Sequence, residues 1–448
     1  MASRLRSLFV VGALVATTAV GAAGPVGSRA LVAPLPLAHW LAGPSHWVQP
    51  PNTKMCKQQT GFKCYAPFQM QKAYDLNPLY AQHLDGTGRT IAIVDSFGSP
   101  TAKQDLKQFD KDFNLPDPPR FKIIQPAGPV PPYDPGNPTM VGWAAETTLD
   151  IEWAHAIAPG ANILLVETPV AETEGVTGFP EIVKSENYVI KHGLADVISQ
   201  SFAATERTFT ADELFALRSA YINAEAHNVT VLAGSGDWGA TGPKPRQGFY
   251  PFRTAQWPSS DPLVTAVGGT RLDLNSQGNR NFPDIAWNET QELGGPAATG
   301  GGRSIFFSRP AYQDSVQNVV ASRRGQPDIS LNAAVNGGVL VYTSFGGFRV
   351  GYHIFGGVSA ATPEFAGVIA IADQAAGKDL GLINPKLYSI GTGSAIPDVT
   401  AGNNTVSFTD KNNQLVTVHG YPAATGYDLS TGLGTVDAAL LVAALGKR

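Results

Sequence analysis

Two carboxylates stand four residues apart in AAETTLDIEWAHAI, residues 144–157, a stretch whose pattern predicts a helix. At that spacing Glu146 and Asp150 share one face of the helix, where like charges repel by about a few tenths of a kcal/mol. A helical wheel places the pair at the edge of an apolar face that includes Trp153. The opposite side carries Thr148, Glu152 and His155. Burial and a second carboxylate both favour the protonated form, so the pair is a candidate acid–base group. The alternative is an acidic pair on a solvated helix rim.

A serine in GGVSAATPEFAGV is a candidate nucleophile. Ser359 follows the Gly356–Gly357 turn and precedes a helix-forming run. Pro363 is tolerated only near the start of a helix, which predicts that Ser359 lies in the first turn. The free N–H groups and the dipole at that end favour developing negative charge. The alternative is a serine that only caps the helix.

An aspartate in VTVLAGSGDWG is the third candidate. The apolar run predicts a buried strand, and the glycine-rich turn that follows it contains Asp237. Ligands of α/β sheets bind at the carboxyl ends of strands, so this position favours a functional role. An aspartate that only forms the turn is the competing interpretation.

A serine nucleophile ordinarily needs a general base, and no histidine of this sequence has the expected setting. None of the eight histidines stands in a His-Gly turn that opens a helix. His155 points away from Glu146, His227 precedes a strand, and His353 lies on the strand before the serine motif. We therefore expect the base to be a carboxylate.

The elements that position these residues alternate between apolar runs and helical segments. Buried strands are predicted for TIAIVDSFG, ANILLVET, ADVISQSF, VTVLAGSGD and PLVTAVGGT. Helices are predicted for SPTAKQDLKQFDKDF, residues 99–113, and for TADELFALRSAYINAEAHN, residues 210–228. Such alternation predicts an α/β fold with a parallel β-sheet flanked by helices on both faces. No linker interrupts the pattern, so we expect one catalytic domain over residues 54–448.

The amino-acid composition limits the classes of molecule that this protein is expected to bind. The 448 residues include 32 Lys and Arg against 36 Asp and Glu, a formal charge of −4, and only 15% are charged. No basic field exists to attract nucleic acid. Few surface carboxylates suit a protein that stays folded in acid. We expect protein or peptide substrates, no nucleic-acid partner and a monomer.

The N-terminus is typical of an exported protein. Arg4 and Arg6 precede the apolar run LFVVGALVATTAV and small residues, which predicts a signal peptide over residues 1–23, cleaved near Ala22 or Ala23. No later run is long enough to span a bilayer, so we expect a secreted, extracellular protein without a membrane anchor. A Pro-rich arm is predicted for residues 24–53.

The chain has two cysteines, and both lie just after the arm. Cys56 and Cys64 are eight positions apart. In an oxidising compartment they can close a short loop as a disulfide, although spacing alone leaves free thiols open.

Taken together, these motifs resemble the sedolisins, serine-carboxyl peptidases with a subtilisin-like fold. The resemblance covers nearly everything from Tyr65 to the C-terminus. GGVSAATPEFAGV resembles the family's nucleophile motif, ETTLDIE followed by APGA its acidic helix, and GSGDWG its oxyanion-hole loop. TGGGRSIFFSRPAYQ and GYDLSTGLGT also resemble family segments. The order of the motifs matches as well.

The resemblance implies a role for each candidate. Ser359 would be the nucleophile, Glu146 its general base, and Asp150 the residue that orients the base. Asp237 would be protonated and would donate a hydrogen bond to the tetrahedral oxyanion. Asp95, in AIVDSFG, would extend the acidic network. The implied activity is that of a secreted endopeptidase that works in acid.

The resemblance also implies one structural calcium ion near the C-terminus. Its carboxylate ligands would be Asp398, in IPDVTAGNN, and Asp428, in ATGYDLSTG. Backbone carbonyls of Val399, Ala424 and Gly426 would complete an oxygen set that suits Ca²⁺.

Two features depart from the family pattern. Sedolisins usually carry a long prodomain, whereas here only the short arm precedes the catalytic part. Phe202, in SQSF, stands where many relatives have Trp at a position that lines the cleft. Three alternatives remain: a tripeptidyl exopeptidase of the same family, an inactive peptidase that only binds peptides, and a neutral subtilisin-type hydrolase that uses Asp95 and an unrecognised histidine.

Overall fold

The structure, a computed structural model, describes residues 39–41, 47–245 and 248–446. The predicted signal peptide, residues 1–23, lies outside the described residues, and the predicted arm, residues 24–53, is described only at 39–41 and 47–53.

An eight-stranded sheet runs through the centre of the described chain. Its strands are, in spatial order, β11 (Ile285–Ala286), β10 (Thr265–Arg271), β8 (Thr230–Gly234), β6 (Val197–Gln200), β3 (Thr90–Ser96), β5 (Asn162–Thr168) and β4 (Phe121–Ile124). The eighth, β14 (Ile329–Asn332), pairs with β10. All pairings are parallel except the one between β10 and β11. The five predicted strands are therefore confirmed as β3, β5, β6, β8 and β10.

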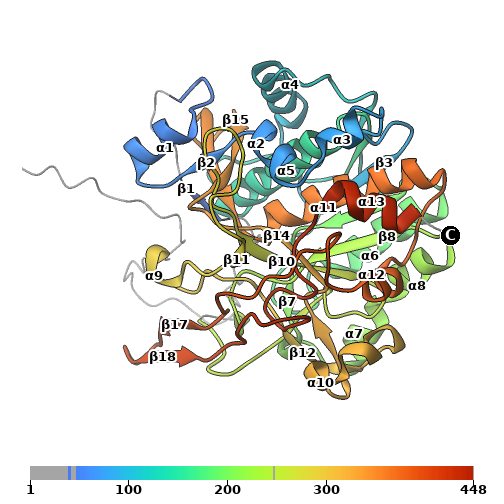
Figure 1. Cartoon of the computed structure of the whole chain (residues 1–448), viewed down its shortest axis with the longest axis vertical. Coiled ribbons are helices and arrows are strands. Elements are labelled where there is room, and N and C mark those ends of the chain that lie inside the picture. Colours follow the sequence, from blue (N-terminus) through green and yellow to red (C-terminus); the bar gives the residue numbers. More distant parts are fainter. Residues whose placement is uncertain (1–38, 42–46, 246–247, 447–448) are drawn as a thin grey trace, which may run out of the picture.

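Helices cover both faces of this sheet because its strands are apolar on both sides. On β3, Ile91 and Ile93 pack into one core, and Ala92 and Val94 pack into another. The first core takes helices α5 (Pro138–Ile157), α11 (Val358–Ala376) and α13 (Ala438–Gly446); the second takes α6 (Phe179–Lys191), α7 (Ala211–Leu217) and α8 (Ser219–Ala226). Figure 1 shows α11 and α13 side by side along β8. The predicted α/β class with helices on both faces is confirmed.

Two predicted helices differ in their bounds. The first, α4, spans Ala102–Phe113 and so begins after the Ser-Pro pair rather than at it. The second predicted helix divides at Arg218 into α7 and α8. The guanidinium of Arg218 is held by Asp261 at 2.5 Å, which fixes the chain where the helix breaks.

A second, four-stranded sheet lies on the other side of α5. Its order is β1 (His39–Leu41), β16 (Gly351–Gly356), β15 (Gly338–Thr343) and β2 (Cys64–Tyr65), and Figure 1 shows β1, β2 and β15 together. The indole N–H of Trp153 donates to the carbonyl of Leu340 at 3.0 Å, and the N–H of Tyr342 donates to Glu152 at 3.0 Å. The helix α5 therefore lies between two sheets.

This position corrects the expectation of an amphipathic helix with a polar side. Thr148, Glu152 and His155 are as fully buried as the acidic pair Glu146 and Asp150. The solvated-rim interpretation is therefore wrong, because Glu146 and Asp150 are fully buried. On the opposite side, β15 covers Glu152, while the segments at Ser99 and Pro116 contact Thr148 and His155.

The remaining elements surround these layers. They are α1 (Thr53–Thr60), α2 (Pro67–Ala73), α3 (Asn77–Tyr80), β7 (Ala204–Thr205), η1 (Glu206–Thr208), β9 (Gln256–Trp257), α9 (Thr290–Leu293), β12 (Gly302–Ser308), η2 (Ala311–Val316), α10 (Gln317–Val320), β13 (Arg323–Gln326), α12 (Asn384–Ile390), β17 (Val406–Thr409) and β18 (Leu415–Val418). A disulfide joins Cys56 on α1 to Cys64 on β2, so the two cysteines are bridged.

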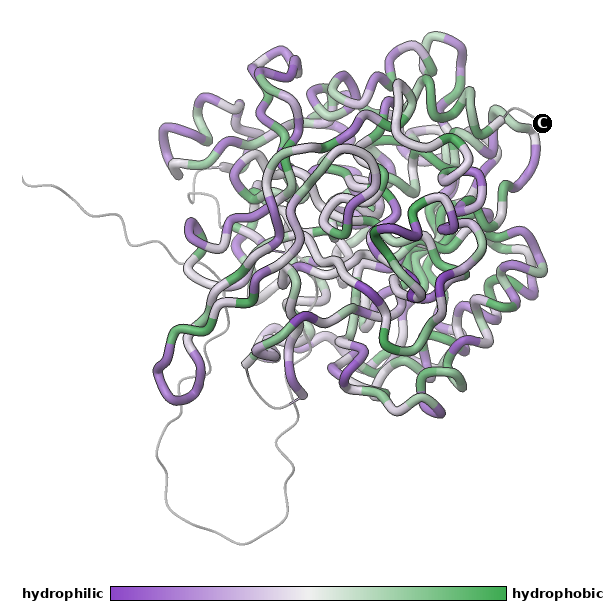
Figure 2. Tube along the Cα trace, turned by 60° about the horizontal axis from the view of Figure 1, so that its bottom comes forward, coloured by the Kyte–Doolittle hydropathy of each residue, from purple (hydrophilic) through white to green (hydrophobic). Residues whose placement is uncertain are grey.

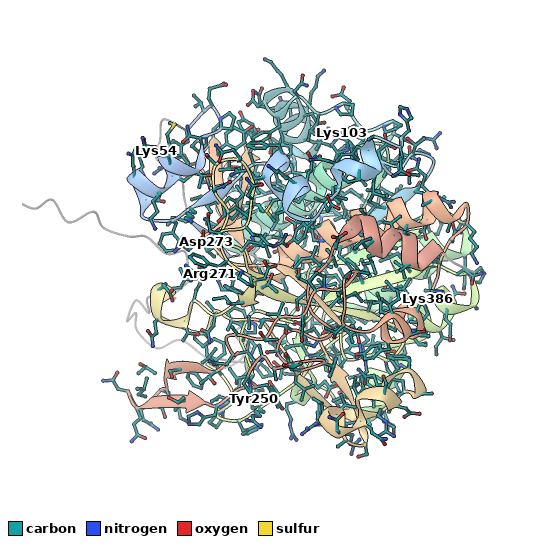
Figure 3. The ribbon with its side chains drawn as sticks, viewed as in Figure 1. Lys54, Lys103, Tyr250, Arg271, Asp273 and Lys386 are labelled. Carbon is teal, nitrogen blue, oxygen red and sulfur yellow. A yellow bond between two sulfur atoms is a disulfide. The ribbon has the colours of Figure 1, made fainter. Side chains whose placement is uncertain are left out.

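Figure 2 shows the hairpin β17–β18 projecting from the body with an apolar stem and a hydrophilic tip. Lys54, Lys103 and Lys386 lie at the periphery in Figure 3. Within the described ranges, no helix has both the length and the apolar character needed to cross a membrane.

Candidate functional site

The first turn of α11 positions Ser359. The N-cap, Gly357, has φ 97°, a conformation that favours glycine, and Ser359 is the second residue of the helix, as predicted. Its side chain is fully buried, and its Oγ makes no hydrogen bond with any described residue. Pro363 lies inside the helix and has no N–H, so it cannot bond to the carbonyl of Ser359.

The helices α5 and α11 pack closely side by side. A Cβ added to Gly367 would lie 2.7 Å from the Cβ of Ile157 and 3.2 Å from the carbonyl oxygen of Ala154. Glu146 precedes Ala154, and Ser359 precedes Gly367, by the same eight residues, which is about 12 Å of helix. Both helices run away from the carboxyl edge of the sheet, so Glu146 and Ser359 both lie in the halves of their helices that are nearer that edge.

Asp150 is the centre of a buried acidic group. Its Oδ1 accepts a hydrogen bond from the hydroxyl of Ser201 at 2.9 Å. Burial raises the pKa of Asp150 well above its usual range, and the nearby carboxyls of Asp95 and Glu146 raise it further. Burial likewise raises the pKa of Asp95 to about 7. Asp95 and Asp150 therefore hold their protons more tightly than exposed carboxyls do, and Glu146 is the further carboxyl beside Asp150.

Asp237 lies beside the N-terminus of α11, the helix that carries Ser359. It follows β8, it is fully buried, and its Oδ1 accepts a hydrogen bond from the N–H of Val358 at 2.8 Å. Burial raises the pKa of Asp237, whereas His39 and the N–H of Val358 lower it. The Nε2 atom of His39 lies 3.3 Å from the other oxygen, Oδ2. Because Oδ1 is already an acceptor, a proton on this carboxyl belongs on Oδ2.

None of the histidines considered from the sequence approaches Ser359. Burial lowers the pKa of both His155 and His353 to about 4. The ring of His155 bonds to the carbonyl of Pro116, and the ring of His227 bonds to a carbonyl of its own helix. Across the described part of the chain, no imidazole bonds to Ser359 Oγ. The expectation that these histidines are structural agrees with these contacts.

A cavity of about 190 Å³ opens close to the acidic group. It is lined by Phe97, Ser99, Pro100, Gln125, Val130, Pro131, Tyr133, Met140 and Glu167. Glu167, whose pKa burial raises, is also the neighbour that adds to the raised pKa of Asp95. Glu146, Asp150, Asp237 and Ser359 do not line this cavity, so Glu167 is its link to the acidic group.

The residues expected to hold calcium are adjacent in space. The N–H of Gly426 donates to Asp398 Oδ2 at 2.8 Å, and the N–H of Ala424 donates to Asp428 Oδ2 at 3.0 Å. Asp398 Oδ1 is buried and has no hydrogen-bond partner among the described residues. The described residues contain no group of three or more His, Cys, Asp or Glu side chains for a metal, but two carboxylates with backbone carbonyls fit Ca²⁺.

The sequence did not single out Ser201 or His39, and it assigned Phe202 to the cleft. Ser201 directly follows β6, so its position at the end of a predicted strand could have marked it as a candidate site residue. No sequence signal singled out His39. Phe202 is fully buried and packs against Phe179 and Trp143, so its side chain belongs to the core.

The relatives found by comparison with known proteins agree with one another. Over 378 residues the chain is 31% identical to kumamolisin of Bacillus sp. (strain MN-32), covering 83% of this chain and 62% of kumamolisin. It is 32% identical over 362 residues to sedolisin of Pseudomonas sp. (strain 101), covering 79% of this chain and 57% of sedolisin. The chain belongs to the sedolisin family. It spans less than two thirds of the length of these curated relatives.

Other members of the family agree with this assignment. The fold matches Pseudomonas sedolisin, a serine-carboxyl proteinase solved with two molecules of pseudo-iodotyrostatin, with a TM-score of 0.69 and 28% identity. That match covers 85% of this chain and 98% of the solved one. Tripeptidyl-peptidase 1 of Homo sapiens is 28% identical over 65% of this chain and 50% of its own length. No family model matches the chain.

Proposed function

We propose that this sedolisin is a secreted serine-carboxyl endopeptidase that hydrolyses peptide bonds of proteins in acid. The observation that carries the proposal is the bond between Asp237 and the N–H of Val358, because it holds a protonatable carboxyl next to Ser359. An oxyanion formed on attack by Ser359 would lie within reach of that carboxyl.

In the proposed reaction, Glu146 removes the proton of Ser359 Oγ as the oxygen attacks the carbonyl carbon of the substrate. Asp237 donates a hydrogen bond from Oδ2 to the oxyanion, and the proton on Glu146 then passes to the leaving amine. A water molecule repeats the sequence on the acyl-enzyme. Asp150 orients Glu146 and shares its protons, and Asp95 extends the network.

Activity is confined to acid in this scheme. Asp237 donates only while it is protonated, so the donor form is lost as pH rises through its pKa. Glu146 accepts a proton only while the acidic group retains a negative charge, so the base is lost as pH falls. Reference carboxyl values near 4, raised by burial, place the maximum at roughly pH 3 to 5.

The proposal includes one structural calcium ion. Asp398 and Asp428 would bind it with the carbonyls of Val399, Ala424 and Gly426, and the ion would tie the two loops together. The unpartnered Oδ1 of Asp398 supports this part of the proposal.

The test compares Ser359→Ala with Ser185→Ala on an unfolded protein substrate. Ser185 is an equally buried serine on α6, across the sheet from the site, and its Oγ makes no hydrogen bond in the described structure. We expect Ser359→Ala to lower kcat by at least about 10³-fold and Ser185→Ala to leave it unchanged. Half of the wild-type activity in Ser359→Ala would rule out the assignment.

Product masses from the same assay decide between modes of cleavage. Internal fragments support an endopeptidase. Release of tripeptides from the N-terminus alone would favour the exopeptidase mode that the name of the human relative describes.

A further inference from the structure

The cavity of about 190 Å³ contains one carboxyl group in a lining that is otherwise uncharged. Apart from Glu167, every residue that lines it is apolar, aromatic or neutral, and Phe97, Tyr133 and Met140 are its largest side chains. Pockets of this composition hold a ligand through their apolar walls and orient it through a few polar groups. Glu167 is therefore the group that decides which charge a ligand of this cavity carries.

The carboxyl of Glu167 is held from two sides. Glu167 lies near the carboxyl end of β5 and is only 7% exposed. Its Oε2 accepts a hydrogen bond from Nε2 of Gln125, which directly follows β4, at 2.7 Å. Its Oε1 lies against Gly98, because a Cβ added there would be 2.1 Å from this oxygen. The absence of a side chain at position 98 therefore makes room for the carboxyl, and a group held in this way is pre-organised for a ligand.

No cation of the described chain neutralises this carboxyl. None of the ion pairs among the described residues includes Glu167. Burial raises the pKa of Glu167, and the hydrogen bond from Gln125 opposes that effect. A buried carboxylate without a cationic partner is costly, so it would bind a cation that enters the cavity. Because the walls are apolar, the best ligand is a cation on an alkyl stem, which is the structure of lysine and arginine side chains.

The cavity lies close to the proposed catalytic centre. Glu167 pairs with Asp95 in the register of β5 and β3, and its charge adds to the raised pKa of Asp95. Met140 of the lining lies in the first turn of α5, about 9 Å of helix before Glu146. An extended peptide covers about 3.3 Å per residue, so this distance equals the length of a few peptide residues.

We propose that this cavity is a binding pocket for a lysine or arginine side chain of a bound peptide, and that Glu167 selects this side chain by pairing with its ammonium or guanidinium group. The alkyl stem would lie along Phe97, Tyr133 and Met140. The source of the peptide rests on the proposed peptidase function, which would then favour substrates with a basic residue near the cleaved bond.

The test measures peptide binding to the full chain with Ser359→Ala, so that no bound peptide is cut. The probes are fluorescein-labelled, alanine-rich peptides of about eight residues in which a single lysine moves from position to position. Each probe has counterparts with norleucine or Nε-acetyl-lysine at the same position. Their Kd is measured by fluorescence anisotropy at about pH 6, between the reference values of glutamate and lysine. At one position lysine should bind about tenfold more tightly than either uncharged counterpart, as expected for one charge-assisted hydrogen bond.

Two variants of the pocket and one control assign this lysine preference to Glu167. Glu167→Gln keeps an acceptor for Gln125 but removes the charge, so lysine and norleucine should then bind within about twofold of each other. Met140→Lys keeps Glu167 and places an ammonium group of the chain itself in the cavity, so it should also remove the preference. The matched control is Asp134→Asn, which removes an exposed charge beside Tyr133 but outside the lining, and it should retain the preference.

The outcomes separate this inference from the peptidase proposal. A lysine preference at one position that both pocket variants lose and the control keeps supports the pocket. The pocket is overturned if no position prefers lysine, if the preference survives in a folded Glu167→Gln protein, or if the control loses it equally. If the preference depends on Glu167 but the chain with Ser359 cleaves no protein, the pocket stands and the peptidase proposal fails. If that chain cleaves protein without any lysine preference in binding, the reverse holds.

Discussion

Replacing Asp237 with asparagine should move the alkaline limit of activity without removing the oxyanion donor. Oδ1 of Asp237 accepts the N–H of Val358 at 2.8 Å. The amide of an asparagine would keep its carbonyl oxygen on that N–H and so place its NH₂ group where Oδ2 now lies. That group donates a hydrogen bond at every pH, whereas the carboxyl donates only while it is protonated.

The magnitude follows from the titration of one group. Burial raises the pKa of Asp237, so the neutral donor predominates below that raised value and is lost above it. Each pH unit above it lowers the donor fraction tenfold, or about 1.4 kcal/mol of transition-state stabilisation. Two units above it, the wild type should be about 100-fold below its maximum. Asp237→Asn should remain within about tenfold of its own maximum there.

The assay is kcat/KM against an unfolded protein from pH 2 to 9 for three proteins. Asp237→Ala is the control for loss of the donor, which should cost about 10²- to 10³-fold throughout the acid range. The mechanism is refuted if Asp237→Asn loses activity over the same alkaline interval as the wild type. An Asp237→Ala protein as fast as the wild type would refute it as well.

Three further predictions test other parts of the site and fold. Ser201→Ala removes a bond that lowers the pKa of Asp150, so the acid limb of the pH profile should move to higher pH; an unmoved limb contradicts the positioning role. Asp398→Ala, or a chelator, should lower Tm, and active protein without calcium by elemental analysis would argue against the ion. Burial raises the pKa of Glu186 to about 8, so its neutral form stabilises the fold most below its unfolded value near 4.5, and this contribution is lost as pH rises to 8. In the wild type, the urea midpoint of unfolding should fall as pH rises from 5 to 8. It should fall less in Glu186→Gln, and by the wild-type amount in the exposed control Glu225→Gln. An equal fall in all three proteins would contradict the reasoning.

Local patterns predicted much of the fold and part of the site. Two patterns are each contained within about ten residues of sequence. One is the strand β8 with its glycine-rich turn, and the other is Gly357 and Pro363 around Ser359. The helix start at Ser359 and the strand end before Asp237 were therefore readable, and so was the parallel sheet. Family resemblance supplied the roles, which the residues alone left open.

The features that the sequence did not predict depend on contacts between segments far apart in the chain. The burial of Glu152 on α5 results from β15, whose residues lie almost 200 positions later, and no helical wheel contains that information. His39 lies in a Pro-rich segment without periodicity, yet sheet pairing brings it to Asp237, which is also about 200 positions away. The predicted helix divides at Arg218, whose guanidinium pairs with Asp261, a tertiary contact that no local pattern contains.

The contact between Gly367 and Ile157 has a consequence for how this protein can change. No side chain fits at position 367 at the present spacing of the two helices, since the added carbon would lie 2.7 Å from the Cβ of Ile157, an atom that every residue except glycine has, and 3.2 Å from the backbone oxygen of Ala154. Any larger residue there would push α11 away from α5 and change the distance between the helices that carry Ser359 and Glu146. We therefore expect position 367 to remain glycine among functional variants in a mutant library, even where position 157 changes to a smaller side chain such as alanine.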